Sequence, residues 1–300
     1  MVCCRDLAEA IRAACPLPLA EEWDNVGLLI GESGKEVRRV MTCLTVSLET
    51  AGEAVRENAD LIVSHHPFPF RAEKRWTDET HAGSVLLTLV RGGVAVFSPH
   101  TAHDSAFWGV NRQLADLFGL TDVKPLCPGD ICAGSAMLGG VPSEKAVLLN
   151  GELDLPLGSG RIGSFPKPVR LSAFADEVCR KLRQPGLTFV GDPNRELSRL
   201  AIGCGAADEF ITEAARAGAD ALLLGEARFH NALLSRELGL ALLLPGHYAT
   251  ERFAMERMAD RLASLFPDLT VWASRSERDP ICYWPNPRHE GPDQDREECF

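Results

Sequence analysis

Histidines and carboxylates follow three apolar runs that have the composition of buried strands. Imidazole nitrogens and carboxylate oxygens are ligands that zinc, iron and manganese accept in proteins. Ligands of open α/β sheets bind beyond the carboxyl ends of the strands, so these positions predict a metal-dependent enzyme rather than a binding module. The three groups are His65 and His66 after residues 61–64, His100 and Asp104 after residues 94–97, and His247 and Glu251 after residues 240–244.

The adjacent pair His65 and His66 indicates two metal ions rather than one. Neighbouring residues on a strand point to opposite faces of the sheet, so both rings cannot serve one ion from a regular strand. Pro67 ends the run, and there the two rings can diverge toward two nearby ions. The alternative is a pair of hydrogen-bonded polar residues that cap the strand.

The other two segments offer carboxylates and further imidazoles. Asp104 is a hard oxygen ligand, and His100 or His103 could act as a ligand, a supporting partner or a proton carrier. His247 and Glu251 open a predicted helix at a spacing that places them on one helical face, and the carboxylate could bridge two ions. Taken alone, each segment also fits a polar loop or a helical surface pair.

The combined set supplies enough ligands for two divalent ions, with positions left for water. Two-metal sites hold their ions roughly 3.5–4 Å apart and produce a hydroxide nucleophile near neutral pH. The mixture of nitrogen and oxygen ligands fits zinc, iron or manganese. The predicted ligands are His65, His66, Asp104, His247 and Glu251.

Further side chains could contact a substrate in the same cleft. His230 follows Glu226 by four residues and could lie at the mouth of the cleft. Arg71 or Arg228 could offset the charge of a phosphate group. Cys204, between two glycines, could be a nucleophile, but no neighbour in the sequence lowers the pKa of its thiol.

The elements that must position these residues alternate between strand-like and helix-like patterns, which is typical of an α/β protein. The segment 120–168 is rich in Gly and Pro and predicts short strands. Predicted strands cover residues 40–46, 59–64, 94–98, 200–204, 219–224, 240–244 and 269–273, and predicted helices cover 6–15, 48–58, 84–91, 111–118, 172–182, 211–217, 231–238 and 250–266.

An internal repeat links the two halves of the chain. Residues 39–60 match residues 199–220 at a shift of 160 without a gap. Chance similarity among βαβ units is the alternative. We expect two similar α/β lobes with mixed sheets flanked by helices and the metal site in the cleft between them. The lobes are residues 1–121 and 122–284, the end of the second could pack back on the first, and residues 285–300 form a polar, disordered tail.

Composition narrows the class of protein. The net charge of −11 gives no general attraction for nucleic acid or for an anionic membrane. No uncharged apolar stretch reaches the roughly 18 residues that span a bilayer, and residues 1–10 contain no apolar signal core. The ten cysteines form no CxxC pair. Reduced thiols in a cytoplasmic protein are therefore expected.

From about residue 21 to residue 283 the chain resembles a family of dinuclear-metal proteins that form hexameric toroids. This family includes the GTP cyclohydrolase I type 2 proteins, also called NIF-three-like proteins. The motifs stand in order at residues 22–31 (Glu-Trp-Asp-Asn-Val-Gly-Leu-Leu-Ile-Gly), 60–67 (Asp-Leu-Ile-Val-Ser-His-His-Pro), 100–104 (His-Thr-Ala-His-Asp), 203–205 (Gly-Cys-Gly), 225–226 (Gly-Glu) and 246–251 (Gly-His-Tyr-Ala-Thr-Glu).

The resemblance implies that the five residues named above ligate two divalent cations, with Glu251 as the bridging ligand. It also implies two similar α/β lobes and a homohexamer, a ring of dimers whose sites face an inner cavity. Some members of the family carry an additional domain between the lobes. This chain is too short for that domain, because only residues 122–170 are available for it.

The chain departs from the family pattern at three places. Thr45 stands where members often have Asp, and His103 stands where the residue before Asp104 is usually apolar. Phe107 and Trp108 occupy a place that is usually smaller. These departures leave the implied ligands intact and bear on the substrate.

We therefore expect a dinuclear metal-dependent hydrolase that uses a metal-bound hydroxide, with His100 or His103 relaying protons. A GTP cyclohydrolase-like reaction on a nucleotide is what the resemblance implies. One alternative is a non-catalytic hexameric scaffold, metal chaperone or regulatory protein that uses the same ligands. A phosphodiesterase or other phosphohydrolase is a second alternative. An open coordination position beside a concave pocket would favour an enzyme.

Overall fold

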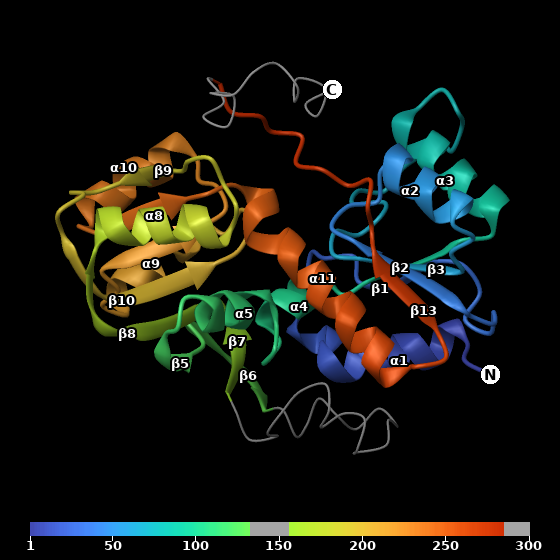
Figure 1. Cartoon of the computed structure of the whole chain (residues 1–300), viewed down its shortest axis with the longest axis horizontal. Helices are drawn as coiled ribbons and strands as arrows, with labels where there is room; N and C mark the ends of the chain where they lie inside the picture. The colour runs from blue at the N-terminus through green and yellow to red at the C-terminus, as the bar shows by residue number, and fades with distance from the viewer. Residues whose placement is uncertain (133–155, 285–300) are drawn as a thin grey trace.

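The computed structural model describes residues 1–132 and 156–284. Two mixed sheets lie at opposite ends of the molecule, each flanked by helices on both faces (Figure 1). The predicted α/β fold with two similar lobes is confirmed. The predicted tail at residues 285–300 lies outside the described residues. No helix in the described ranges is long and apolar enough to cross a membrane.

The first sheet has four parallel strands and an antiparallel edge strand, in the order β1-β4-β3-β2-β13. Apolar side chains fill both of its faces, which is typical of parallel strands covered by helices. Its strands are β1 (Gly27–Ile30), β2 (Arg39–Cys43), β3 (Leu61–Ser64), β4 (Ala95–Ser98) and β13 (Thr270–Ala273).

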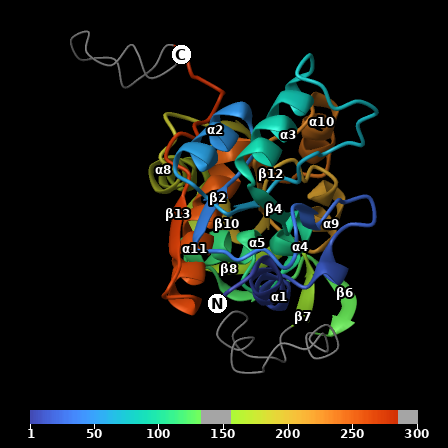
Figure 2. The same ribbon diagram turned by 90° about the vertical axis from the view of Figure 1, so that its right-hand side faces the viewer.

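Helices cover the two faces of this sheet in pairs. The helices α2 (Leu48–Arg56) and α3 (His81–Gly92) pack against one face, where Met41 and Ile62 point. The opposite face, which includes Val63, packs against α1 (Cys4–Ala14) and the C-terminal half of α11 (His247–Leu265). Figure 2 shows α2 and α3 above the strands and α1 below them.

The second sheet has three parallel strands in its centre and antiparallel strands around them, in the order β5-β8-β10-β11-β12-β9. Helices α9 and α10 cover one face, and α5 and α8 cover the other. The strands are β5 (Thr121–Lys124), β8 (Arg161–Arg170), β9 (Thr188–Val190), β10 (Glu196–Gly203), β11 (Ala221–Leu224) and β12 (Ala241–Leu244), and the helices are α5 (Val110–Leu117), α8 (Leu171–Lys181), α9 (Phe210–Arg216) and α10 (Phe229–Glu237).

Four short elements lie near the junction of the lobes. Strands β6 (Cys127–Cys132) and β7 (Pro156–Ser159) form a separate ribbon. A single turn, η1 (Leu17–Leu19), contacts the short helix α4 (His100–Ser105). Helix α4 was not predicted, although it carries one of the three candidate segments.

The internal repeat is confirmed at the level of single hydrogen bonds. Oδ2 of Asp60 accepts two backbone N–H groups at the start of β2, at 2.9 and 3.0 Å. Oδ2 of Asp220, 160 residues later, accepts the two equivalent groups within β10, those of Ser198 and Arg199, at 2.7 and 2.9 Å. Each aspartate precedes a parallel strand, so the same side chain sets the same strand–helix–strand unit in both lobes.

Helix α11 connects the two lobes physically. Its first residues follow β12 of the second sheet, and Ala254 packs in the core of that lobe. One residue later, Met255 packs in the core of the first lobe, together with Leu262. The hydroxyl of Thr42 in β2 donates to the carbonyl of Met255 at 2.7 Å. The next strand, β13, then completes the first sheet beside β2.

Candidate metal centre

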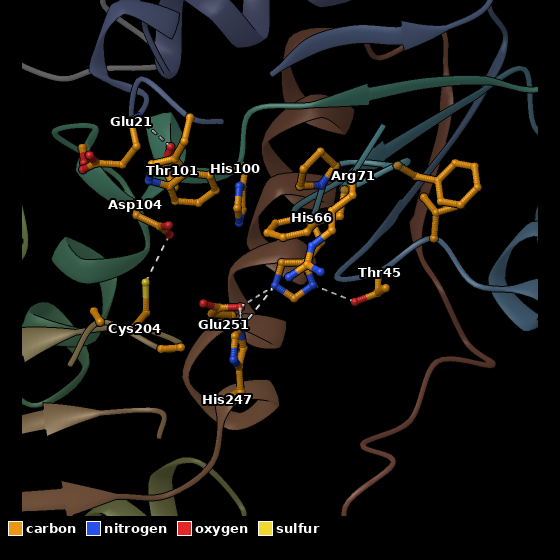
Figure 3. Close-up of a pocket in the computed structure, with 18 of the residues that line it drawn as sticks. Glu21, Thr45, His66, Arg71, His100, Thr101, Asp104, Cys204, His247 and Glu251 are labelled. Carbon is orange, nitrogen blue, oxygen red and sulfur yellow. Dashed lines mark hydrogen bonds and ion pairs between the residues drawn. The ribbon is translucent and has the colours of Figure 1, made fainter. Parts of the chain in front are cut away.

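The candidate ligands converge at a cavity of about 980 Å³. Much of its lining comes from segments that follow β3, β4, β10 and β12, and so from the carboxyl ends of strands in both sheets. Figure 3 shows the imidazoles and carboxylates from these segments pointing toward one another.

Glu251 lies at the centre of the group. Its Oε2 is 3.0 Å from Nε2 of His247, 3.1 Å from Nε2 of His66 and 3.7 Å from Nε2 of His65. Burial would raise the pKa of Glu251, but the charge of His65 and the hydrogen bonds of the other two rings hold it well below its usual range. An ionised carboxylate oxygen within reach of three imidazoles is the arrangement that a bridging ligand requires.

Asp104 is a second carboxylate near His65. Its Oδ1 is 3.5 Å from Nε2 of His65 and accepts the thiol of Cys204 at 3.1 Å. Burial and the charge of Glu251 raise the pKa of Asp104 to about 7 in the metal-free protein. Two buried carboxylates near one another are costly without a cation, so this electrostatic arrangement favours a bound cation.

The donor atoms fit divalent cations. One ligand atom each of His66, His247 and Glu251 lie within 4.8 Å of one another. His65 is 1% exposed, and neither of its ring nitrogens has a hydrogen-bond partner among the described residues. A buried imidazole without a partner is costly, and a metal bond at Nε2 would satisfy that nitrogen. His65 also forms a group with His66 and His100, and Nε2 of both adjacent histidines faces Oε2 of Glu251. That each ring serves a different ion stays a prediction.

Two of these histidines have a partner on the ring nitrogen that faces away from the centre. Nδ1 of His247 lies 2.9 Å from Oε1 of Glu226, and Nδ1 of His66 lies 2.8 Å from Oγ1 of Thr45. Burial would lower the pKa of His247, but Glu251 and Glu226 raise it to about 9. Such partners fix the tautomer and orientation of a metal-binding histidine.

His100 lies beside the centre and is held by Asp24, which the sequence did not single out. Ring centroids place His100 5.2 Å from His65 and 5.6 Å from His66. Its Nδ1 is 2.7 Å from Oδ1 of Asp24. Burial would raise the pKa of Asp24, but hydrogen bonds from His100 and Thr101 lower it. The carboxylate is therefore ionised and orients the imidazole.

His103, the other histidine considered for proton relay, lies behind His65 rather than at the cavity. It is fully buried, and its ring centroid is 5.9 Å from that of His65. Burial lowers the pKa of His103 to about 4, so its ring is neutral at pH 7. His100 lines the cavity and His103 does not.

The four candidate substrate residues are in different places. Arg71 lines the cavity (Figure 3). Glu226 contacts His247, as described above. Arg228 forms an ion pair with Asp208, with Nε and Oδ2 at 3.1 Å, and His230 follows it in α10. Arg228 and His230 are absent from the part of the cavity lining that belongs to described residues.

An exposed aromatic pair forms one wall of the cavity and was also missed by the sequence prediction. Trp23 is 64% exposed and Phe70 is 54% exposed, although both belong to the lining. Their ring centroids are 6.2 Å apart, and each lies about 6 Å from the ring of His100. Apolar rings left in water beside a polar centre are a common feature of ligand sites.

Cys204 has the environment of a hydrogen-bond donor rather than a nucleophile. It is 6% exposed, and burial together with the charge of Asp104 raises the pKa of its thiol well above the usual value. A thiolate is the reactive form of cysteine. The structure therefore gives no support to nucleophilic catalysis by this residue.

The sequence model of the family described as Duf34/NIF3 (NGG1p interacting factor 3) matches residues 2–280. The chain belongs to the Duf34/NIF3 family. The resemblance inferred from the ordered motifs is thereby confirmed, and the family match covers nearly all of the described residues.

Relatives with curated names include two that are each called a GTP cyclohydrolase 1 type 2 homolog. The protein from Streptomyces coelicolor is 31% identical over 282 residues, which cover 92% of each chain. The protein from Nostoc sp. is 32% identical over 232 residues, which cover 77% of this chain and 79% of the relative.

Solved structures of Duf34/NIF3 relatives share the fold. A Bacillus cereus protein related to NIF3 has a TM-score of 0.82 at 22% identity, with 94% of this chain and 99% of that chain covered. Staphylococcus aureus protein SA1388 has a TM-score of 0.80 at 26% identity, with the same coverage.

The departures from the Duf34/NIF3 pattern have distinct surroundings. Thr45 contacts the candidate ligand His66 directly. Phe107 and Trp108 instead pack under arginines: the guanidinium carbon of Arg112 lies 5.3 Å from the Phe107 ring centre, and that of Arg261 lies 3.3 Å from the Trp108 ring centre. Thr45 and His103, which lies against the ring of His65, are therefore the departures beside the candidate metal centre.

Proposed function

We propose that this protein is a divalent-metal-dependent hydrolase with a dinuclear centre. The observation that carries the proposal is the convergence of three imidazole nitrogens on one carboxylate oxygen of Glu251 at a large cavity. The proposed ligands are His65, His66, Asp104, His247 and Glu251, and the ions are zinc, iron or manganese.

Bound ions would act as Lewis acids and would lower the pKa of water toward neutrality. The protein contributes proton transfer through His100, whose Nδ1 is fixed by Asp24. An imidazole oriented by a carboxylate can take or give a proton at its other nitrogen near neutral pH. The cavity beside the ions favours an enzyme over a closed, purely structural metal site.

A purine nucleotide is the substrate that the surroundings support best. The relatives described above are named GTP cyclohydrolase 1 type 2 homologs. Trp23 and Phe70 offer exposed aromatic faces on which a base could stack, and Arg71 could bind a phosphate. In a cyclohydrolase reaction, water would add to the carbon between the two nitrogens of the purine imidazole ring, and the ring would open.

The assembly and the domain boundaries belong to the same proposal. A homohexamer built as a ring of dimers is proposed from the family resemblance. Lobes with a boundary near residue 121 are proposed from the internal repeat.

The first test is metal analysis of the purified wild type beside the double variant Asp104→Ala, Glu251→Ala. We expect about two divalent ions per wild-type chain and a clear loss in the variant. Equal metal contents in the two proteins would refute the dinuclear centre.

The second test is turnover by the metal-loaded wild type. GTP, other nucleotides and phosphodiesters are incubated with it, and products are separated by chromatography. Ring-opened product from GTP supports the cyclohydrolase assignment, and phosphate or monoester release supports a phosphohydrolase. A metal-loaded protein that turns over none of them would favour a scaffold or metal chaperone.

A further inference from the structure

We propose that the two metal positions of this centre differ in affinity, and that the position formed by His66, His247 and Glu251 fills first. The second position, formed by His65 and Asp104 with Glu251 shared, is the weaker one. This inference rests on the proposed dinuclear centre and concerns how the residues of this chain prepare each half of it.

The donor atoms of the stronger position lie close together, and hydrogen bonds support both of its histidines. Nε2 of His66 and Nε2 of His247 are 3.3 Å apart, and each lies within 3.1 Å of Oε2 of Glu251. The far nitrogen of each ring already has a hydrogen-bond partner, Thr45 in one case and Glu226 in the other. Binding an ion here leaves neither ring with an unsatisfied nitrogen, so little rearrangement is required.

Thr45 is itself held by a buried ion pair. Its backbone N–H donates to Oε1 of Glu277 at 2.7 Å, and that of Leu44 donates to Oε2 at 2.9 Å. Oε2 of Glu277 also lies 2.8 Å from Nε of Arg252, which directly follows Glu251 in α11. The hydroxyl that orients His66 is therefore fixed by the same helix that carries the shared carboxylate.

The weaker position lacks this support. His65 is fully enclosed, and its Nδ1 has no acceptor within the described residues. With no partner at Nδ1, no hydrogen bond from a described residue fixes the tautomer or the orientation of the His65 ring toward an ion. The distances from Nε2 to the carboxylates of Asp104 and Glu251, 3.5 and 3.7 Å, are also longer than those in the other position.

Asp104 is the other ligand specific to this position. Its Oδ1 already accepts the thiol of Cys204 at 3.1 Å, and the thiol is buried. The thiol uses one lone pair of Oδ1 and leaves the other for an ion. The ligands specific to the weaker position are therefore less well prepared than the two histidines of the stronger position.

The test is calorimetric titration of the metal-free, full-length protein with Zn²⁺ alone. We expect two binding steps whose dissociation constants differ by at least about tenfold. Thr45→Val and Glu226→Ala each remove one hydrogen-bond partner, and each should weaken the first step by about 10- to 100-fold. The second step should change less.

Matched controls make the same chemical changes away from the centre. Thr88→Val removes a hydroxyl in α3 whose hydrogen bond stays within that helix, and Glu237→Ala removes a carboxylate at the end of α10. Both should leave the two steps unchanged. Circular dichroism of every variant checks that the fold is retained.

Two indistinguishable steps, or weakening of the second step alone, would overturn the inference. Unequal steps without nucleotide turnover would support it while the hydrolase proposal fails. Equal steps with nucleotide turnover would overturn the inference and support the hydrolase proposal. A protein that binds no Zn²⁺ would overturn both the inference and the hydrolase proposal.

Discussion

Nδ1 of His100 and Oδ1 of Asp24 lie 2.7 Å apart, although 76 residues separate them in the chain. The same carboxylate accepts the backbone N–H of Thr101 at 3.1 Å. Asp24 therefore fixes both the imidazole and the first turn of α4 that carries it. Asp24 precedes β1 and His100 follows β4, and the antiparallel pairing of Gly27 with Ser98 brings the two side chains to the same end of the sheet.

Asp24→Asn should separate proton transfer from metal binding. The amide can keep a hydrogen bond to His100 but favours the wrong tautomer and cannot stabilise a protonated ring. We expect turnover to fall by about 100-fold or more with an unchanged metal content. Rates and metal contents are measured on the same samples, with Asp116→Asn as a surface control. If Asp24→Asn turns over substrate at the wild-type rate, His100 does not transfer the proton in this mechanism.

Gly205→Ala should displace the shared carboxylate. A methyl group at this glycine would overlap Oε1 of Glu251 and would lie 3.1 Å from Nε2 of His247. Gly239→Ala is the matched control, because Gly239 has a similar φ of +69° and no atom within 4 Å of the added methyl. Metal analysis should show loss of ions only in Gly205→Ala. If both variants keep two ions, Glu251 does not hold them.

Chelation should lower the melting temperature, because the proposed ligands come from both lobes. Ligand binding stabilises the native state by about 2.7 kcal/mol when the free ion is at 100 times its dissociation constant. Differential scanning calorimetry with and without EDTA measures this effect. The variant Asp104→Ala, Glu251→Ala should show the same melting temperature with and without EDTA. A wild type whose melting temperature does not change when EDTA is added would contradict the prediction.

Arg161→Met should destabilise the junction of the lobes. The buried guanidinium donates to the carbonyls of Gly158 and Gly160 at 2.6 Å, to that of Ala106 at 2.6 Å and to that of Ser105 at 3.1 Å. Burial lowers the pKa of Arg161 to about 10, which still leaves it charged at pH 7. We expect a loss of about 3 kcal/mol in urea unfolding. A loss below about 0.5 kcal/mol, the range of ordinary surface substitutions, would contradict this role.

Glu53→Gln should produce a stability defect that depends on pH. Burial would raise the pKa of Glu53, but hydrogen bonds from Ser274, Ser276 and the backbone lower it from 4.5 to about 2. Because the folded-state value is the lower one, the carboxylate stabilises the fold above pH 4.5. That contribution is lost as the pH falls toward 2.

We expect Glu53→Gln to cost about 2 kcal/mol at pH 7. The difference from the wild type should shrink between pH 4.5 and about 2. Urea unfolding at several pH values measures it. A difference that stays constant over that range would show that the charge of Glu53 is not involved.

The segments that carry the proposed ligands and meet at the cavity could be predicted because their signals are local. His65 and His66 directly follow a short apolar run, and His247 and Glu251 lie four residues apart at the start of a helix. The internal repeat could be predicted for the same reason, since a strand–helix–strand unit with one aspartate recurs at a constant shift.

The missed features depend on contacts between distant residues or on short elements. The α4 segment, His-Thr-Ala-His-Asp, has no apolar periodicity from which a helix could be read. The contact between Thr45 and Glu277 spans 232 residues, and no local pattern around either one indicates it. Trp23 could have been noticed only as an exposed aromatic inside a polar motif, and exposure is a property of the folded chain.

Helix α11 limits how this protein could enclose a substrate. Its N-terminal end carries two of the proposed ligands, His247 and Glu251, at the second sheet, and its later turns are packed into the core of the first lobe. A hinge motion that opened the lobes would have to bend this continuous helix or pull it from a core, and either would move Glu251 away from the other ligands. Entry and release should therefore depend on the side chains and loops at the rim of the cavity, with the lobes staying at a fixed separation through each turnover.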